Sequence, residues 1–343
     1  MDISVLGLPQ SGKSTFLKSL IKFNDSQELP EICTLKINDD RLKEVGKLLG
    51  HNKLSYPEIS FKEVNILSIK NNKTTELKEI ESIQNSYGLL LVIRCFENNH
   101  SNQILSDIDE IITELIFSDT VIIENIIERR KNNTKGKTKQ ELENINGEIQ
   151  LLETLKLHLE QGQPLNSYTL PKTELKKLVG YNLITLKPIF VLLNYDQDRS
   201  IIESNGDITK VKNKYCYPAK LEMELSELSE NESEEFRQSL NIEPRQDYKV
   251  LKSLFKAMGK IIFITAGEQE IKGWEINKGD NSLIAASKIH SDISKGFIRA
   301  EVIEYNTFIE LGSWNNCKKE GKVKGNGKEY IVNDGDIINF LHS

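Results

Sequence analysis

Residues 7–14, Gly-Leu-Pro-Gln-Ser-Gly-Lys-Ser, constrain the fold most, because they match the pattern G-x-x-x-x-G-K-[ST]. In such a loop the backbone N–H groups wrap a phosphate, the lysine reaches the β- and γ-phosphate oxygens, and the serine hydroxyl binds Mg²⁺. An apolar strand (residues 3–6) precedes the loop and an amphipathic helix (13–21) follows it, a placement that disfavours a chance glycine turn. We therefore expect a phosphate site, with Ser14 as metal ligand, made by Gln10, Ser11, Gly12, Lys13, Ser14 and Thr15.

Short apolar segments alternate with helical stretches over the first two hundred residues. They are residues 33–37, 59–69, 89–96 and 189–194. This alternation predicts an α/β fold with a mostly parallel sheet covered by helices. At roughly 100–200 residues per domain, the 343-residue length predicts two or three domains.

Two long helices interrupt this pattern, over residues 107–131 and 139–161, and predict an antiparallel hairpin. Its tip reads RRKNNTKGKTK, without an acidic residue. Such a basic tip is a candidate contact for a phosphate backbone, although a solvated turn explains it equally well. The candidate residues for RNA or partner binding are Arg129, Arg130, Lys131, Lys135, Lys137 and Lys139.

From residue 260 onward, short strands and turns predict a separate β-rich domain, with a strong turn signal at residues 333–336. The net charge is −6, which disfavours a protein that coats nucleic acid, and no apolar run approaches the length of a membrane span. The four cysteines are scattered, which argues against disulfides and zinc. We expect a cytoplasmic monomer without a membrane or specific DNA partner.

A second candidate loop follows the strand 189–194, where Asn194, Tyr195, Asp196 and Gln197 stand at the place of the guanine-reading motif Asn-Lys-x-Asp. A carboxylate there accepts two N–H bonds from guanine, whereas the Gln197 amide has one acceptor, so strict guanine selection is not expected. A polar turn without ligand is the alternative. The expected base-side residues are Asn194, Tyr195, Gln197, Ala219 and Lys220.

Taken in order, these segments resemble the Obg-like ATPases of the YchF type. The matching stretches are GLPQSGKST, LVIRCFE (91–97), DIDEIITELIFSD (107–119), LLETLKLHLEQGQP (151–164), LNYDQ, AKLEMEL (219–225) and most of residues 261–337, including TAGEQEIKGWEI and NDGD. They cover most of the chain. The resemblance implies a GTPase-like P-loop domain, an inserted coiled-coil hairpin and a C-terminal ubiquitin-like β-grasp (TGS) domain. It also implies ATP preference, with GTP possible, and association with ribosomes or ribosomal RNA. Family members carry Asn-x-x-Glu for base reading, and Gln197 departs from it.

The expected domain boundaries are residues 1–104 with 184–259 for the P-loop domain, 105–183 for the hairpin and 260–343 for the β-grasp domain. The switch regions depart most from the family. No Asp-x-x-Gly occurs between residues 59 and 87, so we expect no Walker B carboxylate behind the metal and no evident catalytic residue. Whether Glu63, Glu76 or Asp39 replaces the missing carboxylate stays open. Thr34, a candidate metal threonine, reads better as a strand residue.

Three functions remain open on this evidence. The first is a purine-nucleotide-binding, ribosome-associated protein, preferring ATP with Mg²⁺, with weak or no hydrolysis. The second is a pseudo-ATPase adaptor that recognises RNA or protein through the hairpin and the TGS-like domain. The third, a small-molecule kinase, is weakest because nothing resembles a substrate lid.

Overall fold

The computed structural model of the chain describes residues 1–21, 29–65, 74–96, 101–133, 136–196, 202–203, 206–239, 246–267 and 270–343. The chain forms two compact units. The first contains Met1–Cys33 and Ser60–Asp247, and the second contains Thr34–Ile59 and Tyr248–Ser343. Residues 34–59 thus belong with the C-terminal part of the chain, a grouping that the sequence did not indicate. The predicted three-domain division stays a prediction.

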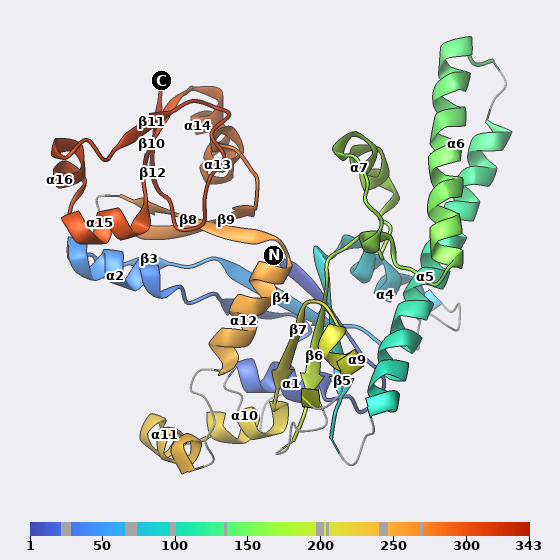
Figure 1. Cartoon of the computed structure of the whole chain (residues 1–343), viewed down its shortest axis with the longest axis horizontal. Coiled ribbons are helices and arrows are strands. Elements are labelled where there is room, and N and C mark those ends of the chain that lie inside the picture. The colour runs from blue at the N-terminus through green and yellow to red at the C-terminus, as the bar shows by residue number, and fades with distance from the viewer. Residues whose placement is uncertain are drawn as a thin grey trace. The chain divides into compact units, whose positions relative to one another are not determined.

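A six-stranded sheet forms the centre of the described P-loop region, in the order β2-β4-β1-β5-β6-β7. Figure 1 labels β4, β5, β6 and β7 of this sheet. Strand β1 pairs in parallel with both β4 and β5, and β5-β6 and β6-β7 are also parallel. The strands are β1 (Asp2–Leu6), β2 (Cys33–Lys36), β4 (Glu58–Glu63), β5 (Gly88–Arg94), β6 (Ile189–Asn194) and β7 (Lys214–Tyr217). Parallel strands buried on both faces read as continuous apolar runs, which is why β5 and β6 were recognisable in the sequence.

Helices cover the sheet. On α1 the Phe16 ring packs edge-on against Phe61 of β4 and Tyr217 of β7. A second cluster joins Ile83, Ile104 and the strand residue Leu91. The helices of this region are α1 (Lys13–Ile21), α4 (Thr74–Asn85), α5 (Ser101–Asn132), α6 (Lys139–Glu160), α7 (Lys172–Leu178), α9 (Gly206–Lys210), α10 (Ala219–Ser226), α11 (Glu230–Ser239) and α12 (Gln246–Ala257, which continues into the second unit).

The predicted hairpin is present as α5 and α6. The first half of α5 packs in the sheet cluster, and the second half packs against α6 through a separate cluster that includes Ile123, Leu152 and Leu155. Thr138 begins α6 with a capping box, because its hydroxyl accepts from the Glu141 N–H and its own N–H donates to the Glu141 carboxylate. No helix in the described part of the chain is both long and apolar enough to cross a bilayer.

The second unit contains another six-stranded sheet, ordered β11-β10-β12-β8-β9-β3. The hairpin β8-β9, the helix α13 and the return of β12 beside β8 in parallel give the β-grasp arrangement expected for this region. Its elements are α2 (Asp40–Leu49), β3 (Leu54–Ser55), β8 (Lys260–Ala266), β9 (Ile271–Asn277), α13 (Ser282–Ile289), α14 (Ser291–Lys295), β10 (Phe297–Ile303), α15 (Tyr305–Leu311), α16 (Trp314–Lys319), β11 (Lys324–Asn326) and β12 (Ile337–His342).

Candidate nucleotide site

The phosphate-binding loop joins the carboxyl end of β1 to α1. Gln10 and Gly12 both have positive φ, 62° and 92°, so the backbone turns sharply here. A Cβ on Gly7 would lie 2.5 Å from the carbonyl oxygen of Val92, which leaves room only for glycine. Gln10 and Ser14 are exposed and Thr15 is half-buried. The loop therefore has the compact backbone that phosphate binding requires.

Lys13 is held against its own loop. Its Nζ donates to the carbonyl oxygens of Gly7 (3.1 Å) and Leu8 (3.2 Å). Burial lowers the pKa of Lys13, and the Glu63 carboxylate, 3.9 Å from Nζ, partly offsets that shift. Phosphate oxygens can replace the two carbonyls as stronger, charged acceptors for this ammonium.

Glu63 is one of the acidic residues that could replace the missing carboxylate, and the structure places it beside the phosphate loop. It ends β4, which is the parallel neighbour of β1, with Glu63 in register with Val5. Its Oε2 accepts a hydrogen bond of 2.8 Å from the Ser14 hydroxyl. A glutamate thus lies beside Ser14, the expected metal ligand, although the sequence lacks the Asp-x-x-Gly pattern. The available signal was a carboxylate at the end of an apolar strand, but strand pairing was needed to bring it to Ser14.

The residues at this point fit a magnesium–nucleotide complex. The Ser14 hydroxyl and the Glu63 carboxylate are hard oxygen donors, and Mg²⁺ is bound by few protein ligands together with phosphates and waters. The described residues contain no cluster of three or more His, Cys, Asp or Glu side chains, so any metal here would have few protein ligands. The buried Ser11 Oγ has no hydrogen-bond partner among the described residues, so the loop also retains an unused polar atom.

Asn194 braces the loop. Its Nδ2 donates to the Ser11 carbonyl (3.0 Å) and its Oδ1 accepts from the Ala219 N–H (3.1 Å), and the residue is 4% exposed. The side chain lies so close that a Cβ on Gly12 would stand 2.2 Å from Nδ2. Asn194 was expected to line a base pocket, and the structure shows that its amide joins the phosphate loop to the segment that begins α10.

The structure gives less information on the other residues expected near the base. Tyr195 packs against the sheet cluster, and Lys220 is exposed in the first turn of α10. Gln197 lies outside the described residues. Thr34 lies within β2, in agreement with its reading as a strand residue. The described structure therefore brings together the loop, Ser14, Glu63 and Asn194, and leaves base recognition as a prediction.

The hairpin tip has less unpaired positive charge than its sequence alone indicates. Arg130 pairs with Glu148 of α6 (Nε–Oε2 3.1 Å) and also donates to the Tyr181 hydroxyl, and Lys131 pairs with Glu153 at 3.1 Å. The pairing glutamates come from the facing helix, so the local stretch of sequence did not reveal them. Arg129, Lys137 and Lys139 are exposed and form no ion pair with any residue that the structure describes, and Lys135 lies outside the described residues.

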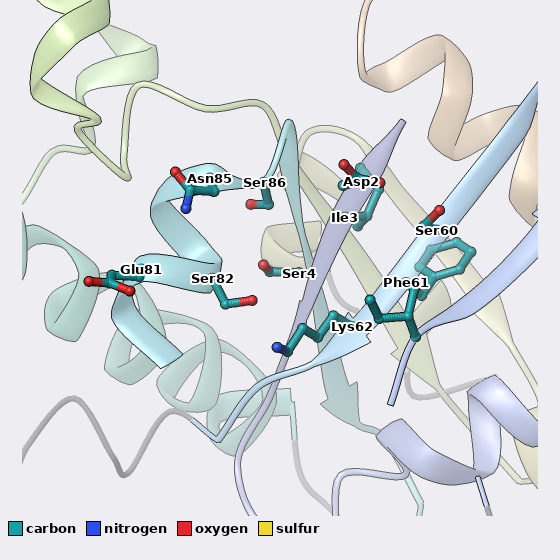
Figure 2. Close-up of a pocket in the computed structure, with 11 residues that line it drawn as sticks. Asp2, Ile3, Ser4, Ser60, Phe61, Lys62, Glu81, Ser82, Asn85 and Ser86 are labelled. Atoms are coloured by element: carbon teal, nitrogen blue, oxygen red, sulfur yellow. The ribbon is translucent and has the colours of Figure 1, made fainter. Parts of the chain in front are cut away.

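A separate pocket of about 360 Å³ is lined by residues of β1, β4 and α4, among them Ser4, Lys62 and Ser82 (Figure 2). It includes Asp2, at the start of β1, whereas the phosphate loop follows the opposite end of that strand. None of the described residues predicted for nucleotide or partner binding lines it. The pocket is therefore distinct from the candidate nucleotide site.

Comparisons with known proteins agree with this architecture. A family model named for the C-terminal part of YchF GTPases, described as a protein of unknown function (DUF933), matches residues 261–343. The chain is 32% identical to the ribosome-binding ATPase YchF of Buchnera aphidicola (from Acyrthosiphon pisum), with 98% of each chain covered. It is 31% identical to the protein of that name from Haemophilus influenzae, with 98% of this chain and 97% of the relative covered. The solved structure of the Schizosaccharomyces pombe YchF GTPase matches with a TM-score of 0.81 and 23% identity, over 99% of this chain and 97% of that one. The P-loop region, the inserted hairpin and the β-grasp region are thus shared over almost the full length, and the chain belongs to the YchF family.

Proposed function

We propose that this chain binds a purine nucleotide with Mg²⁺ at the phosphate loop, in the cytoplasm, and acts on the ribosome. The observation that carries the proposal is the set of contacts among Lys13, Ser14 and Glu63. These groups supply a cation for the phosphates and two oxygen donors for the metal. We expect no strict selection of GTP, because Gln197 lacks the carboxylate that selects guanine. The resemblance to the Obg-like ATPases favours ATP.

Turnover is expected to be slow. The loop lysine and a carboxylate behind the metal are present, but phosphoryl transfer also needs a group that positions the attacking water. The sequence has no glycine between Gly50 and Gly88, so the mobile glycine turn that follows the carboxylate in relatives is missing. We therefore propose binding with weak hydrolysis, with the chain's own residues holding and orienting the phosphates.

The test is calorimetric titration of the nucleotide-stripped full chain with ATP and GTP, with and without Mg²⁺, followed by a phosphate-release assay. We expect Mg²⁺-dependent binding that is lost in Lys13→Ala. Lys177→Ala, which changes an exposed lysine of α7 in the same unit, is the matched control. Failure of wild-type protein to bind either nucleotide would contradict the proposal and favour the adaptor alternative, in which the loop is structural.

The partner part of the proposal rests on the names of the ribosome-binding relatives and on the hairpin tip. Because Arg130 and Lys131 are already paired, the contact with ribosomal RNA is expected to use Arg129, Lys137 and Lys139. Reversing these three charges to glutamate should reduce co-sedimentation with ribosomes and weaken its salt dependence. The matched control reverses Lys172, Lys176 and Lys177 of α7. Equal co-sedimentation of both variants would remove the tip from the proposal.

A further inference from the structure

The second unit contains a pocket of about 610 Å³ that has no part in the nucleotide site. It is bordered by the face of α12 from Tyr248 onward, the start of β8, the turn after β9 and two loops, residues 37–41 and 331–334. Its volume lies within the range of small-molecule sites, about 300–1,000 Å³. The turn glycines Gly259 and Gly279 line it, and a Cβ on either would meet no atom within 4 Å. No other protein atoms therefore crowd the pocket at these two turns.

The two acidic groups of this pocket share one arginine. Arg41 donates to Asp39 (Nε–Oδ1 3.0 Å) and to Asp334 (Nη1–Oδ2 2.9 Å and Nη2–Oδ1 3.1 Å). Asp334 also accepts from the Ile262 N–H at 2.9 Å. One guanidinium and two carboxylates thus form a network in the wall that carries one net negative charge, and the four lysines of the lining outweigh it.

Lysines supply the remaining charge of the lining. Lys252 lies over the Tyr248 ring, 5.7 Å from its centroid, and Lys260 donates to the Asn277 side chain at 2.9 Å. The side chains of Lys256 and Lys278 are exposed and make no hydrogen bond or ion pair with any residue that the structure describes. The pocket is therefore cationic on a chain whose net charge is −6.

Apolar surface lies beside these cations. Ile37, Phe255 and Val332 are buried residues that line the pocket, and Ile331 at its border is 51% exposed. Contact with an apolar ligand would remove this surface from water, which is favourable by about 25 cal/mol per Å². A phosphate ion alone would leave this apolar wall uncovered, whereas a neutral apolar molecule would give Lys256 and Lys278 no ionic partner.

We propose that this pocket binds a small amphipathic anion, with an apolar body against Phe255 and Ile331 and a phosphate, sulfonate or carboxylate group at Lys256 and Lys278. Lysine binds such groups as a point charge, so the site does not require the bidentate geometry of arginine. The proposal is independent of the phosphate loop, because no loop residue lines this pocket.

The first probe is the fluorescent sulfonate 8-anilinonaphthalene-1-sulfonate, titrated into the full folded chain. We expect saturable binding of one molecule, at least tenfold tighter than binding of the uncharged analogue N-phenyl-1-naphthylamine. Lys13→Ala should bind the probe as wild type does. Loss of binding in Lys13→Ala would place the probe at the phosphate loop and overturn the proposal.

Two variants locate the site. The double variant Lys256→Glu with Lys278→Glu should weaken sulfonate binding at least tenfold, and its matched control is Lys319→Glu with Lys328→Glu, two exposed lysines of the same unit. Ile331→Glu, at an exposed position, should also weaken binding without unfolding the domain, which circular dichroism checks. Equal affinity in all variants would overturn the proposal.

A second pair of probes distinguishes the anionic groups. Decyl phosphate and decanoate share an apolar tail, so competition with the fluorescent probe compares their head groups alone. Displacement by either supports the proposal and identifies the favoured group. Displacement by neither, or equal displacement by decanol, would overturn it.

Discussion

Two cationic regions of this chain, the phosphate loop and the hairpin tip, use their charge in opposite ways. At the loop, Lys13 is held by carbonyl oxygens that a phosphate can replace. At the tip, Arg130 and Lys131 are already paired with glutamates of α6. The loop motif predicted its arrangement because its binding groups are consecutive in the chain. Counting the charges of the tip along the sequence overestimated its free positive charge, because the pairing glutamates lie on the facing helix.

The largest effect is expected from adding one methyl group to the loop. Gly12→Ala introduces a Cβ 2.2 Å from Asn194 Nδ2 at a residue with φ of 92°. A cost of about 3 kcal/mol or more at the loop would lower ATP affinity on the order of 100-fold. Calorimetry measures this change, and urea denaturation measures the accompanying loss of stability.

The tip provides the control for that variant. Gly136 also has positive φ, 77°, but a Cβ there meets nothing within 4 Å. Gly136→Ala should therefore cost only the backbone term, about 1–2 kcal/mol, and leave ATP affinity unchanged. If both variants weaken ATP binding equally, the contrast between the two regions is wrong.

The next effect concerns the metal. Glu63→Gln removes the charge that holds the Ser14 hydroxyl, so the Mg²⁺-dependent part of ATP affinity should fall about 10- to 100-fold. Titrations with and without Mg²⁺ isolate this part. Glu153→Gln at the tip should leave both titrations unchanged, and Glu63→Asp should restore part of the magnesium effect. A full magnesium effect in Glu63→Gln would exclude this residue from the metal site.

A smaller, continuous effect is expected from pH. Because burial lowers the pKa of Lys13, its ammonium loses its proton before exposed lysines do, and ATP affinity should fall as pH rises through that lowered pKa. The unfolded chain binds the extra proton there, so this group makes folding stability rise with pH over the same interval. ATP titrations between pH 7 and 10 on wild type and Lys13→Arg check this, since arginine stays charged. Parallel pH profiles would contradict the assignment.

The smallest effect is expected at the tip itself. Glu148→Gln removes the partner of Arg130, whose side chain is 41% exposed, so unfolding free energy should fall by no more than about 1 kcal/mol. Glu143→Gln, an exposed glutamate of the same helix, is the control. Urea denaturation compares the two. A loss several times larger would mean that the ion pair organises the hairpin.

Much of the fold was predictable from local patterns. The loop between β1 and α1, the long helices α5 and α6, and the strands β5 and β6 each carry a periodicity or motif within a few consecutive residues. Residues 34–59 were not predictable as part of the second unit. Their grouping depends on pairs such as β3 with β9, which join segments far apart in the sequence.

The site was predictable only where its residues are adjacent. Glu63 is 49 positions from Ser14, and nothing in its own neighbourhood resembles the expected Asp-x-x-Gly. The bracing role of Asn194 also depends on three segments meeting at one amide. A motif indicated Asn194 as a site residue, but the parallel strand order sets the contacts of both side chains.

The Asn194 amide has a consequence for how this chain can change over evolutionary time. Its Nδ2 and its Oδ1 each bond a main-chain group, so this one side chain connects the phosphate loop to the segment that begins α10. A replacement at this position would leave main-chain groups of two segments without their partners at the same time. We therefore expect Asn194 to change less readily than the exposed residues around it.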